Sequence, residues 1–182
     1  DRLWRVPHFE KMLYDNAQLA RVYLEAFAQT QDRVFRHMAV RIFQFVEREM
    51  TSPEGGFYSA IDAESEHEEG KYYVWTKEEV RSVLNPYEFS VVSNVQMNGP
   101  PNLTADRYVL QLGDSLPSIA KKTGINEGDL AGALEQSAAK LFAARSLRKR
   151  PLLDTKILTD GNGLMIAALA RRLSETAADP LP

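Results

Sequence analysis

The sequence of 182 residues contains no cysteine. Such a chain forms no disulfide, and it has no thiolate to act as a nucleophile, a redox centre or a zinc ligand. The absence is compatible with a reducing cytoplasm, so we expect a cytoplasmic location. No apolar run approaches the roughly 20 residues that span a bilayer, and no secretory signal is recognisable, so no membrane segment is expected. Because the chain opens on Asp1 without a methionine, we expect a fragment of a longer protein.

An excess of basic charge is also missing. Lysine and arginine number 22 against 25 aspartates and glutamates, which gives a formal net charge of −3. The basic residues are scattered apart from a cluster at 145–150, so we expect no nucleic-acid partner. The apolar share of 44% and the charged share of 26% are those of an ordinary globular protein. A chain of this length supports one domain, and we expect a single domain over 1–182.

Helical periodicity dominates what is present. Apolar residues follow one face over 9–27 and again over 32–50, and a short polar connection joins the two segments. This pattern predicts an antiparallel αα-hairpin. The sequence predicts further helical segments at 76–84, 87–95 (a turn or two), 115–124, 126–149 and 160–177. Thr76 and Glu79 form a capping box at the start of the first of these, and Gly124 closes the third. A short strand is expected at 108–112. The last of these is apolar nearly all round in its first turns, so we expect it to be central, with residues 178–182 frayed.

The stretch 55–75, GGFYSAIDAESEHEEGKYYVW, stands out in this helical chain. Two aromatic, β-prone arms flank the acidic residues, which predicts one small β-hairpin at 56–75 with a long tip. The acidic residues of the tip are Asp62, Glu64, Glu66, Glu68 and Glu69. A solvated loop is the simpler interpretation, whereas the nearby aromatic side chains favour a polar ligand. The acidic spacing is not that of an EF-hand, and we expect no metal and no cofactor.

Four blocks of the sequence resemble a known family. They are VPHFEKMLYD at 6–15, GGFYSAIDAESE at 55–66, EEGKYYVW at 68–75 and RPLLDTKILTDGNGLMIAAL at 150–169. In this order they resemble the spermatogenesis-associated, thioredoxin-domain-containing protein family, least clearly between 86 and 144. Three positions differ from the family pattern: Glu64 replaces an aspartate, His67 replaces a glycine, and 160–163 reads Asp-Gly-Asn-Gly where Ser-Trp-Asn-Gly is usual.

The resemblance implies a mainly α fold, a partial α/α toroid of the six-hairpin glycosidase class. Family members look like a thioredoxin-like domain followed by a barrel similar to that of N-acylglucosamine 2-epimerase. This chain corresponds to the middle of the barrel, without the thioredoxin-like domain. The implied function is that of a carbohydrate-active domain, either a sugar epimerase or isomerase or a glycosidase, with a saccharide ligand.

In an α/α barrel the loops at one end of the helices form the pocket. The resemblance therefore points to catalytic candidates at His8, Asp62, Glu64 and Glu69, and to substrate contacts at Tyr72, Trp75, Arg148, Asp154 and Asn162. Paired carboxylates suit glycoside hydrolysis, and a histidine suits proton abstraction beside a carbonyl.

Structural roles compete with the catalytic ones. His8 is as well placed for a structural hydrogen bond, and His37 and His67 are expected to be exposed. Arg148 either caps carbonyls at the end of a helix or extends outward to solvent, or it pairs with Asp154 or with the acidic stretch. Asp160 or Asn162 is expected to be a helix N-cap.

A non-catalytic helical module is the alternative function. Half of a toroid leaves apolar helix flanks uncovered, and such flanks favour a homodimer or a protein partner.

Overall fold

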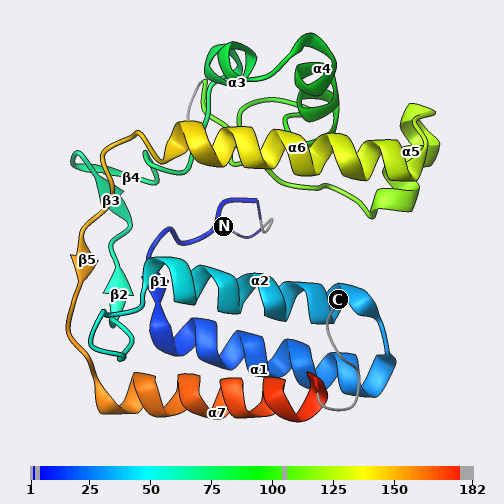
Figure 1. Ribbon diagram of the computed structural model, residues 1–182. Helices are drawn as coiled ribbons and strands as arrows, with labels where there is room; N and C mark the ends of the chain where they lie inside the picture. Colours follow the sequence, from blue (N-terminus) through cyan, green and yellow to red (C-terminus); the bar gives the residue numbers. More distant parts are fainter. Residues whose placement is uncertain (1, 3–4, 104–105, 177–182) are drawn as a thin grey trace. The chain divides into compact units, whose positions relative to one another are not determined.

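The computed structural model describes residue 2, residues 5–103 and residues 106–176. Within these residues the chain is mainly helical and contains a small β-hairpin, as the sequence predicts (Figure 1). It divides into two compact units: unit 1 comprises 1–9 and 64–150, and unit 2 comprises 10–63 and 151–182. Each unit is described by itself. Among the described residues, no helix is both long enough and apolar enough to cross a membrane.

Unit 2 is built on three helices (Figure 1). They are α1 (Leu13–Thr30), α2 (Arg33–Glu49) and α7 (Thr159–Thr176). A two-residue connection joins α1 to α2, and Asp32 caps α2 by accepting a hydrogen bond from the Val34 amide, so the predicted αα-hairpin is confirmed. Helix α1 begins four residues later than its apolar pattern, because Lys11 and Met12 form a strand instead.

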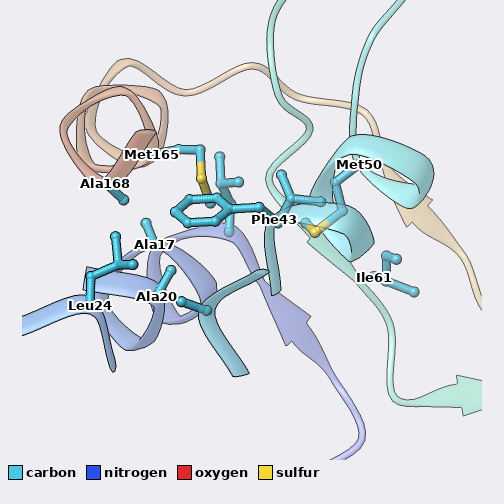
Figure 2. Packing of buried hydrophobic residues seen from close by; sticks show 11 residues of the cluster. Ala17, Ala20, Leu24, Phe43, Met50, Ile61, Met165 and Ala168 are labelled. Carbon is cyan, nitrogen blue, oxygen red and sulfur yellow. The ribbon is translucent and has the colours of Figure 1, made fainter. Parts of the chain in front are cut away.

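Small and flexible apolar side chains fill the core of unit 2 (Figure 2). Ala17 and Ala20 of α1 let the neighbouring helices approach closely, and Phe43 of α2 and Met165 of α7 fill the space between them. Helix α1 packs against both α2 and α7. The expectation that the last helix is central is therefore wrong within this chain: α7 buries Met165 and Ala168 but leaves Ile166 exposed, and α1 is the shared neighbour.

A short sheet closes one end of unit 2. Strand β2 (Ala60–Ile61) pairs antiparallel with β1 (Lys11–Met12) on one side and with β5 (Leu153–Asp154) on the other. The two β-prone arms around the acidic run thus do not pair with each other. The first arm pairs with these distant strands, and the second contributes Trp75 to an isolated bridge with Tyr108. At the strand predicted for 108–112, the described residues show this isolated bridge and no regular strand.

Unit 1 holds the remaining helices: α3 (Lys77–Val83), α4 (Pro86–Val95), α5 (Leu116–Thr123) and α6 (Glu127–Arg145). Helices α3, α4 and α5 pack against α6.

The predicted capping box at the start of α3 is present, with Thr76 and Glu79 each bonding the amide of the other. Gly124 ends α5 in a left-handed conformation, as the sequence predicts. Helix α6 ends at Arg145, a turn before the predicted end. The frayed end predicted at 178–182 lies outside the described residues.

Candidate functional site

The acidic run folds into a tight hairpin in unit 1. Strand β3 (Glu64–Ser65) pairs antiparallel with β4 (Glu68–Glu69), and Glu66 and His67 form the two-residue connection. Both connecting residues have positive φ, 54° for Glu66 and 63° for His67. Type I′ turns have this property, and they usually carry asparagine or glycine there. A small β-hairpin is therefore present, but the acidic run itself forms it at 64–69, and the two arms predicted to pair do not.

The register of the hairpin sorts its side chains onto two faces. Ser65 lies opposite Glu68, and Glu64 lies opposite Glu69. Because successive residues of a strand point to opposite faces, these two pairs lie on different faces of the ladder. Glu64 and Glu69 are both exposed, and the Cβ atoms of such a cross-strand pair are about 4.5–5.5 Å apart. The fold thus brings two of the predicted catalytic carboxylates side by side.

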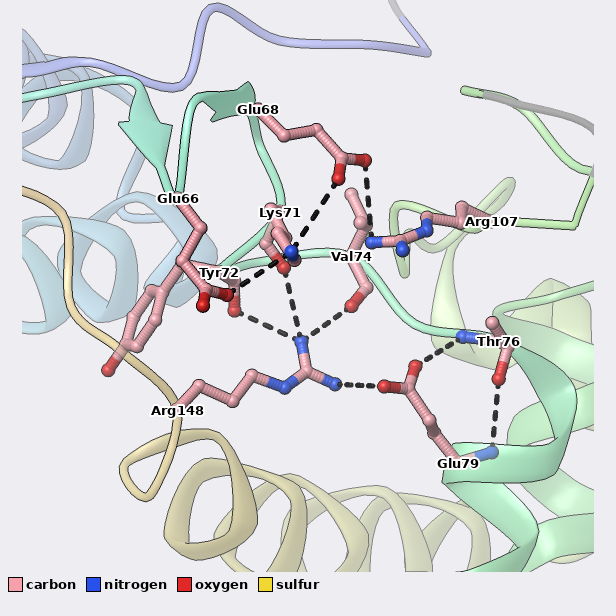
Figure 3. Close-up of polar contacts among 9 residues, drawn as sticks. All are labelled: Glu66, Glu68, Lys71, Tyr72, Val74, Thr76, Glu79, Arg107 and Arg148. Atoms are coloured by element: carbon pink, nitrogen blue, oxygen red, sulfur yellow. Dashed lines mark hydrogen bonds and ion pairs between the residues drawn. The ribbon is translucent and has the colours of Figure 1, made fainter.

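The opposite face of the ladder anchors it to unit 1. The Ser65 hydroxyl is buried and donates a hydrogen bond to the carbonyl of Lys149. Lys71 Nζ lies 3.2 Å from a Glu66 carboxylate oxygen and 3.9 Å from one of Glu68, and Arg107 lies 3.6 Å from the other Glu68 oxygen (Figure 3). Glu66 and Glu68 therefore help to hold the hairpin in place.

Arg148 fixes the chain that leaves the hairpin. Its Nη1 donates to the carbonyls of Lys71, Tyr72 and Val74 at 3.4, 3.2 and 2.7 Å, and its Nη2 lies 3.2 Å from Glu79 Oε1 (Figure 3). Burial lowers the pKa of the Arg148 guanidinium, and the Glu79 carboxylate opposes that shift. The Glu79 carboxylate makes two interactions: Oε1 pairs with Arg148, and Oε2 accepts the capping-box hydrogen bond from the Thr76 amide. The acid that pairs with Arg148 is Glu79 of α3, and not Asp154 or an acid of the hairpin as predicted.

The aromatic candidates form a packed layer with these arginines. Tyr72 and Trp75 are only 6% and 4% exposed. The Arg148 guanidinium lies 4.0 Å from the centre of the Trp75 ring, and the Arg145 guanidinium lies 5.3 Å from that of Tyr72. Cation–π contacts of this kind stabilise the layer. The structure therefore brings Tyr72, Trp75 and Arg148 together, with the two rings covered by the arginines.

His8 directly precedes Phe9, whose ring packs against the residues that follow β4. The ring of its neighbour Phe9 is buried and stacks on Tyr73 with 5.9 Å between ring centroids. The same ring lies so close to Gly70 that a Cβ there would come within 2.6 Å of it. Phe9 directly follows His8, and Gly70 directly follows Glu69. The contact between Phe9 and Gly70 therefore joins the chain neighbours of two candidate residues. His8 itself is exposed, as are His37 and His67 in agreement with the sequence.

The other three candidates lie in unit 2. Asp62 has an exposed side chain, and its amide donates to the carbonyl of Leu152 at 2.8 Å. The Asp154 carboxylate lies 3.0 Å from Lys156 Nζ, and the hydrogen bond from this ammonium is the main reason that the pKa of Asp154 is lowered.

Asn162 joins the first turn of α7 to the segment before β2. Its Oδ1 accepts from the Phe57 amide at 2.8 Å, and its Nδ2 donates to the carbonyls of Phe57 and Leu158 at 3.0 and 2.9 Å. Asn162 is therefore a cross-link and not the predicted N-cap. Asp160, the other candidate for that cap, accepts a hydrogen bond from the next amide, that of Gly161.

The supporting residues of the hairpin were not predicted from the sequence. Ser65, Lys71 and Arg107 hold it in place, and only the alternation of Ser65 with the acids hinted at an inward-facing position. Within the described residues, no group of three or more His, Asp or Glu side chains is arranged to hold a metal ion.

These observations define a mainly helical chain that carries an acidic hairpin held in place by other residues of unit 1. The chain is 37% identical to spermatogenesis-associated protein 20 of mouse and of human, over 93% of its own length and 25% of theirs. It is 29% identical to an uncharacterized protein of Caenorhabditis elegans, over 95% of its length and 27% of that protein. These similarities support the family indicated by the four sequence blocks. The chain spans about a quarter of the length of the curated relatives it matches. No protein-family model matches it.

Proposed function

We propose that the chain is part of a carbohydrate-active α/α-toroid domain in which Glu64 and Glu69 act as an acid–base pair on a saccharide. The observation that carries this proposal is their register: they are direct partners across β3–β4, and both are exposed on the face of the ladder opposite Ser65 and Glu68. Two carboxyl groups roughly 5 Å apart suit retaining hydrolysis of a glycoside, and 6.5–9.5 Å suits inversion. Each glutamate extends two carbons beyond its Cβ, which brings both spacings within reach.

In the proposed reaction, one carboxyl group in its acid form gives its proton to the glycosidic oxygen as the bond from the sugar carbon breaks. In the inverting case the other carboxylate takes a proton from the water that attacks this carbon. His8, whose neighbour Phe9 contacts Gly70, is the proposed additional proton carrier. The same imidazole would serve as the base if the reaction were epimerisation beside a carbonyl. Asp62 belongs to unit 2, and its catalytic role stays a prediction from the sequence.

Sugar release from a panel of chromogenic α- and β-glycosides tests the proposal. We expect at least one substrate to be cleaved, and Glu64→Gln and Glu69→Gln to lower the rate by about 10²- to 10⁴-fold, the usual contribution of a positioned acid or base. Glu47→Gln, the same change at an exposed position of α2, is the control and should leave the rate unchanged. Cleavage that survives both hairpin substitutions would exclude the pair.

The helix pairing and the exposed apolar side chains of unit 2 support the proposal of a toroid. Helices α1 and α2 form an αα-hairpin, the repeating element of such barrels, and apolar side chains of α1 and α7 remain uncovered. Val22 of α1 is 58% exposed, and Ile166 of α7 is 61% exposed. In a complete toroid, neighbouring helix pairs cover residues of this kind.

The same exposed side chains favour the alternative function, a module that associates with a second copy of itself. Among the described residues, the exposed aliphatic side chains on α1 and α7 include Leu19, Val22, Leu164 and Ile166. Under this proposal the chain is a dimer by light scattering, and Ile166→Asp makes it a monomer. Leu147→Asp, at a 90% exposed position in unit 1, is the matched control and should leave the mass unchanged. A monomer at every concentration up to the solubility limit would rule out self-association.

A further inference from the structure

Unit 1 also contains a cavity that shares no lining residue with the acidic hairpin. A cavity of about 570 Å³ lies between the end of α4, the segment that follows it, and α5. This volume is within the 300–1,000 Å³ typical of small-molecule sites. Four of its lining residues are buried and mainly apolar: Val95, Met97, Tyr108 and Ile119. None of the candidate residues of the hairpin lines it.

The wall of the cavity is fixed by specific hydrogen bonds. The Asn102 side chain accepts from the Val109 amide at 2.7 Å and donates to the Val109 carbonyl at 3.0 Å, so one side chain pairs with the backbone as a strand would. The Tyr108 hydroxyl donates to the carbonyl of Gly99 at 3.4 Å, where the backbone has a φ of 105°. A site whose wall is already ordered loses little entropy when a ligand binds.

The main acid in the lining is already neutralised. The Asp114 carboxylate accepts hydrogen bonds from Lys122 Nζ at 2.7 Å, from the Ser118 hydroxyl at 2.6 Å and from the Ser115 amide at 2.8 Å. These bonds, that from Lys122 foremost, hold the pKa of Asp114 well below its usual range. The acid and its cation satisfy each other. Arg5, the other charged residue of the lining, also has an interaction partner, so the lining does not demand a charged ligand.

Three amide side chains in the lining remain available. Gln96, Asn98 and Gln111 border the cavity, and within the described part of the chain their side chains make no hydrogen bond to protein. Each amide offers two N–H donors and one carbonyl acceptor. Hydroxyl groups donate and accept at the same atom, so they match this mixture better than carboxylates or phosphates, which only accept.

We propose that this cavity binds an uncharged polyhydroxy ligand, a saccharide of one or two rings. The amides of Gln96, Asn98 and Gln111 contact its hydroxyl groups, and the apolar floor formed by Met97, Tyr108 and Ile119 contacts a C–H face of the ring. The site shares no residue with the Glu64–Glu69 pair, so it does not rest on the proposed catalytic function.

Binding to the intact chain tests the proposal directly. Ligand-detected NMR and calorimetry are used with neutral aldoses, N-acetylated aldoses and disaccharides, and with a sugar phosphate and a nucleoside as charged and aromatic comparisons. We expect at least one neutral saccharide to bind. The double variant Gln96→Leu/Gln111→Leu should weaken binding at least tenfold, because it removes two hydrogen-bonding groups. Gln136→Leu, the same change at an exposed position of α6 outside the cavity, should leave the affinity unchanged.

Three outcomes would overturn the proposal: no neutral saccharide binds, the double variant binds as tightly as the parent chain, or the sugar phosphate or the nucleoside binds more tightly than every neutral sugar. Saccharide binding in the cavity can also be tested independently of the hairpin glutamates. Glu64→Gln and Glu69→Gln should leave the saccharide affinity of the cavity unchanged, so a failure of the proposed catalysis and a failure of this site give different results.

Discussion

Glu64 and Glu69 are direct partners across the β3–β4 ladder, so two carboxylates of like charge occupy opposite positions on one exposed face. Like charges at directly opposed positions destabilise a strand pair. We therefore expect Glu69→Gln to raise the free energy of unfolding by about 0.2–1 kcal/mol. Urea denaturation measures the change. Glu68→Gln, the matched change on the other face, removes contacts with Lys71 and Arg107 and should not stabilise the chain.

His67 occupies the left-handed region, with a φ of 63°, at the position where the resembled family usually has glycine. Residues with a Cβ are strained there, whereas glycine is not. His67→Gly is therefore expected to stabilise the chain by about 0.5–1 kcal/mol, measured by thermal or urea unfolding. The control is His37→Gly in the interior of α2, where the same exchange should destabilise by about the same amount. A loss of stability in His67→Gly would contradict the strain argument.

Arg148 bonds three backbone carbonyls and one carboxylate, and only 22% of its side chain is exposed. Arg148→Met leaves those carbonyls without their donor, and we expect a loss of about 2–4 kcal/mol in the free energy of unfolding. Arg81→Met is the control. Arg81 is exposed and stacks on Phe89 at 4.7 Å, so its removal should cost less than about 1 kcal/mol. Equal effects of the two substitutions would show that the carbonyl contacts contribute little.

Asn162 holds both backbone groups of Phe57. Asn162→Leu removes these bonds and should lower the free energy of unfolding by about 2 kcal/mol. In Gln18→Leu the lost amide is exposed and bonds only the Tyr14 carbonyl within its own helix, so the expected change is within about 0.5 kcal/mol. Urea denaturation of both variants makes the comparison, and a neutral Asn162→Leu would disprove the cross-link.

Glu88 is 2% exposed and accepts two hydrogen bonds from Lys140 Nζ, at 2.6 and 2.8 Å. The bond from Lys140 lowers the pKa of Glu88 from its ordinary value of 4.5. Because the lowered pKa belongs to the folded state, its stabilisation is complete above pH 4.5 and is lost as the pH falls below that value. The melting temperature of the parent chain should therefore fall more steeply below this pH than that of Glu88→Gln. If the melting temperatures of the two chains fell equally with pH, Glu88 would not contribute to the acid sensitivity.

Local signals in the sequence predicted most of the helices. Apolar spacing located α1 and α2, the Thr76–Glu79 capping box located α3, and Gly124 located the end of α5. These features depend on residues three or four apart, so they act within one turn of helix. Even here the start of α1 differs from the prediction, because Lys11 and Met12 pair with the distant strand Ala60–Ile61.

Partners distant in the sequence could not be predicted in this way. The β-prone composition of 57–61 and 71–75 was recognised, but two-residue strands carry no signal of their own register. The assignment of the last helix to the centre failed for a related reason: an all-round apolar helix shows that neighbours are needed, and it does not show which neighbours the chain supplies.

The sequence by itself determined the helical segments, their caps and the concentration of five acids in one stretch, because these follow from spacing and composition over a few residues. The tertiary structure decided which acids became anchors and which stand paired and exposed, because Lys71, Arg107 and Arg148 act through the folded chain. It also decided that the Gln96, Asn98 and Gln111 amides border one cavity, since their convergence depends on how α4, α5 and the segment between them pack.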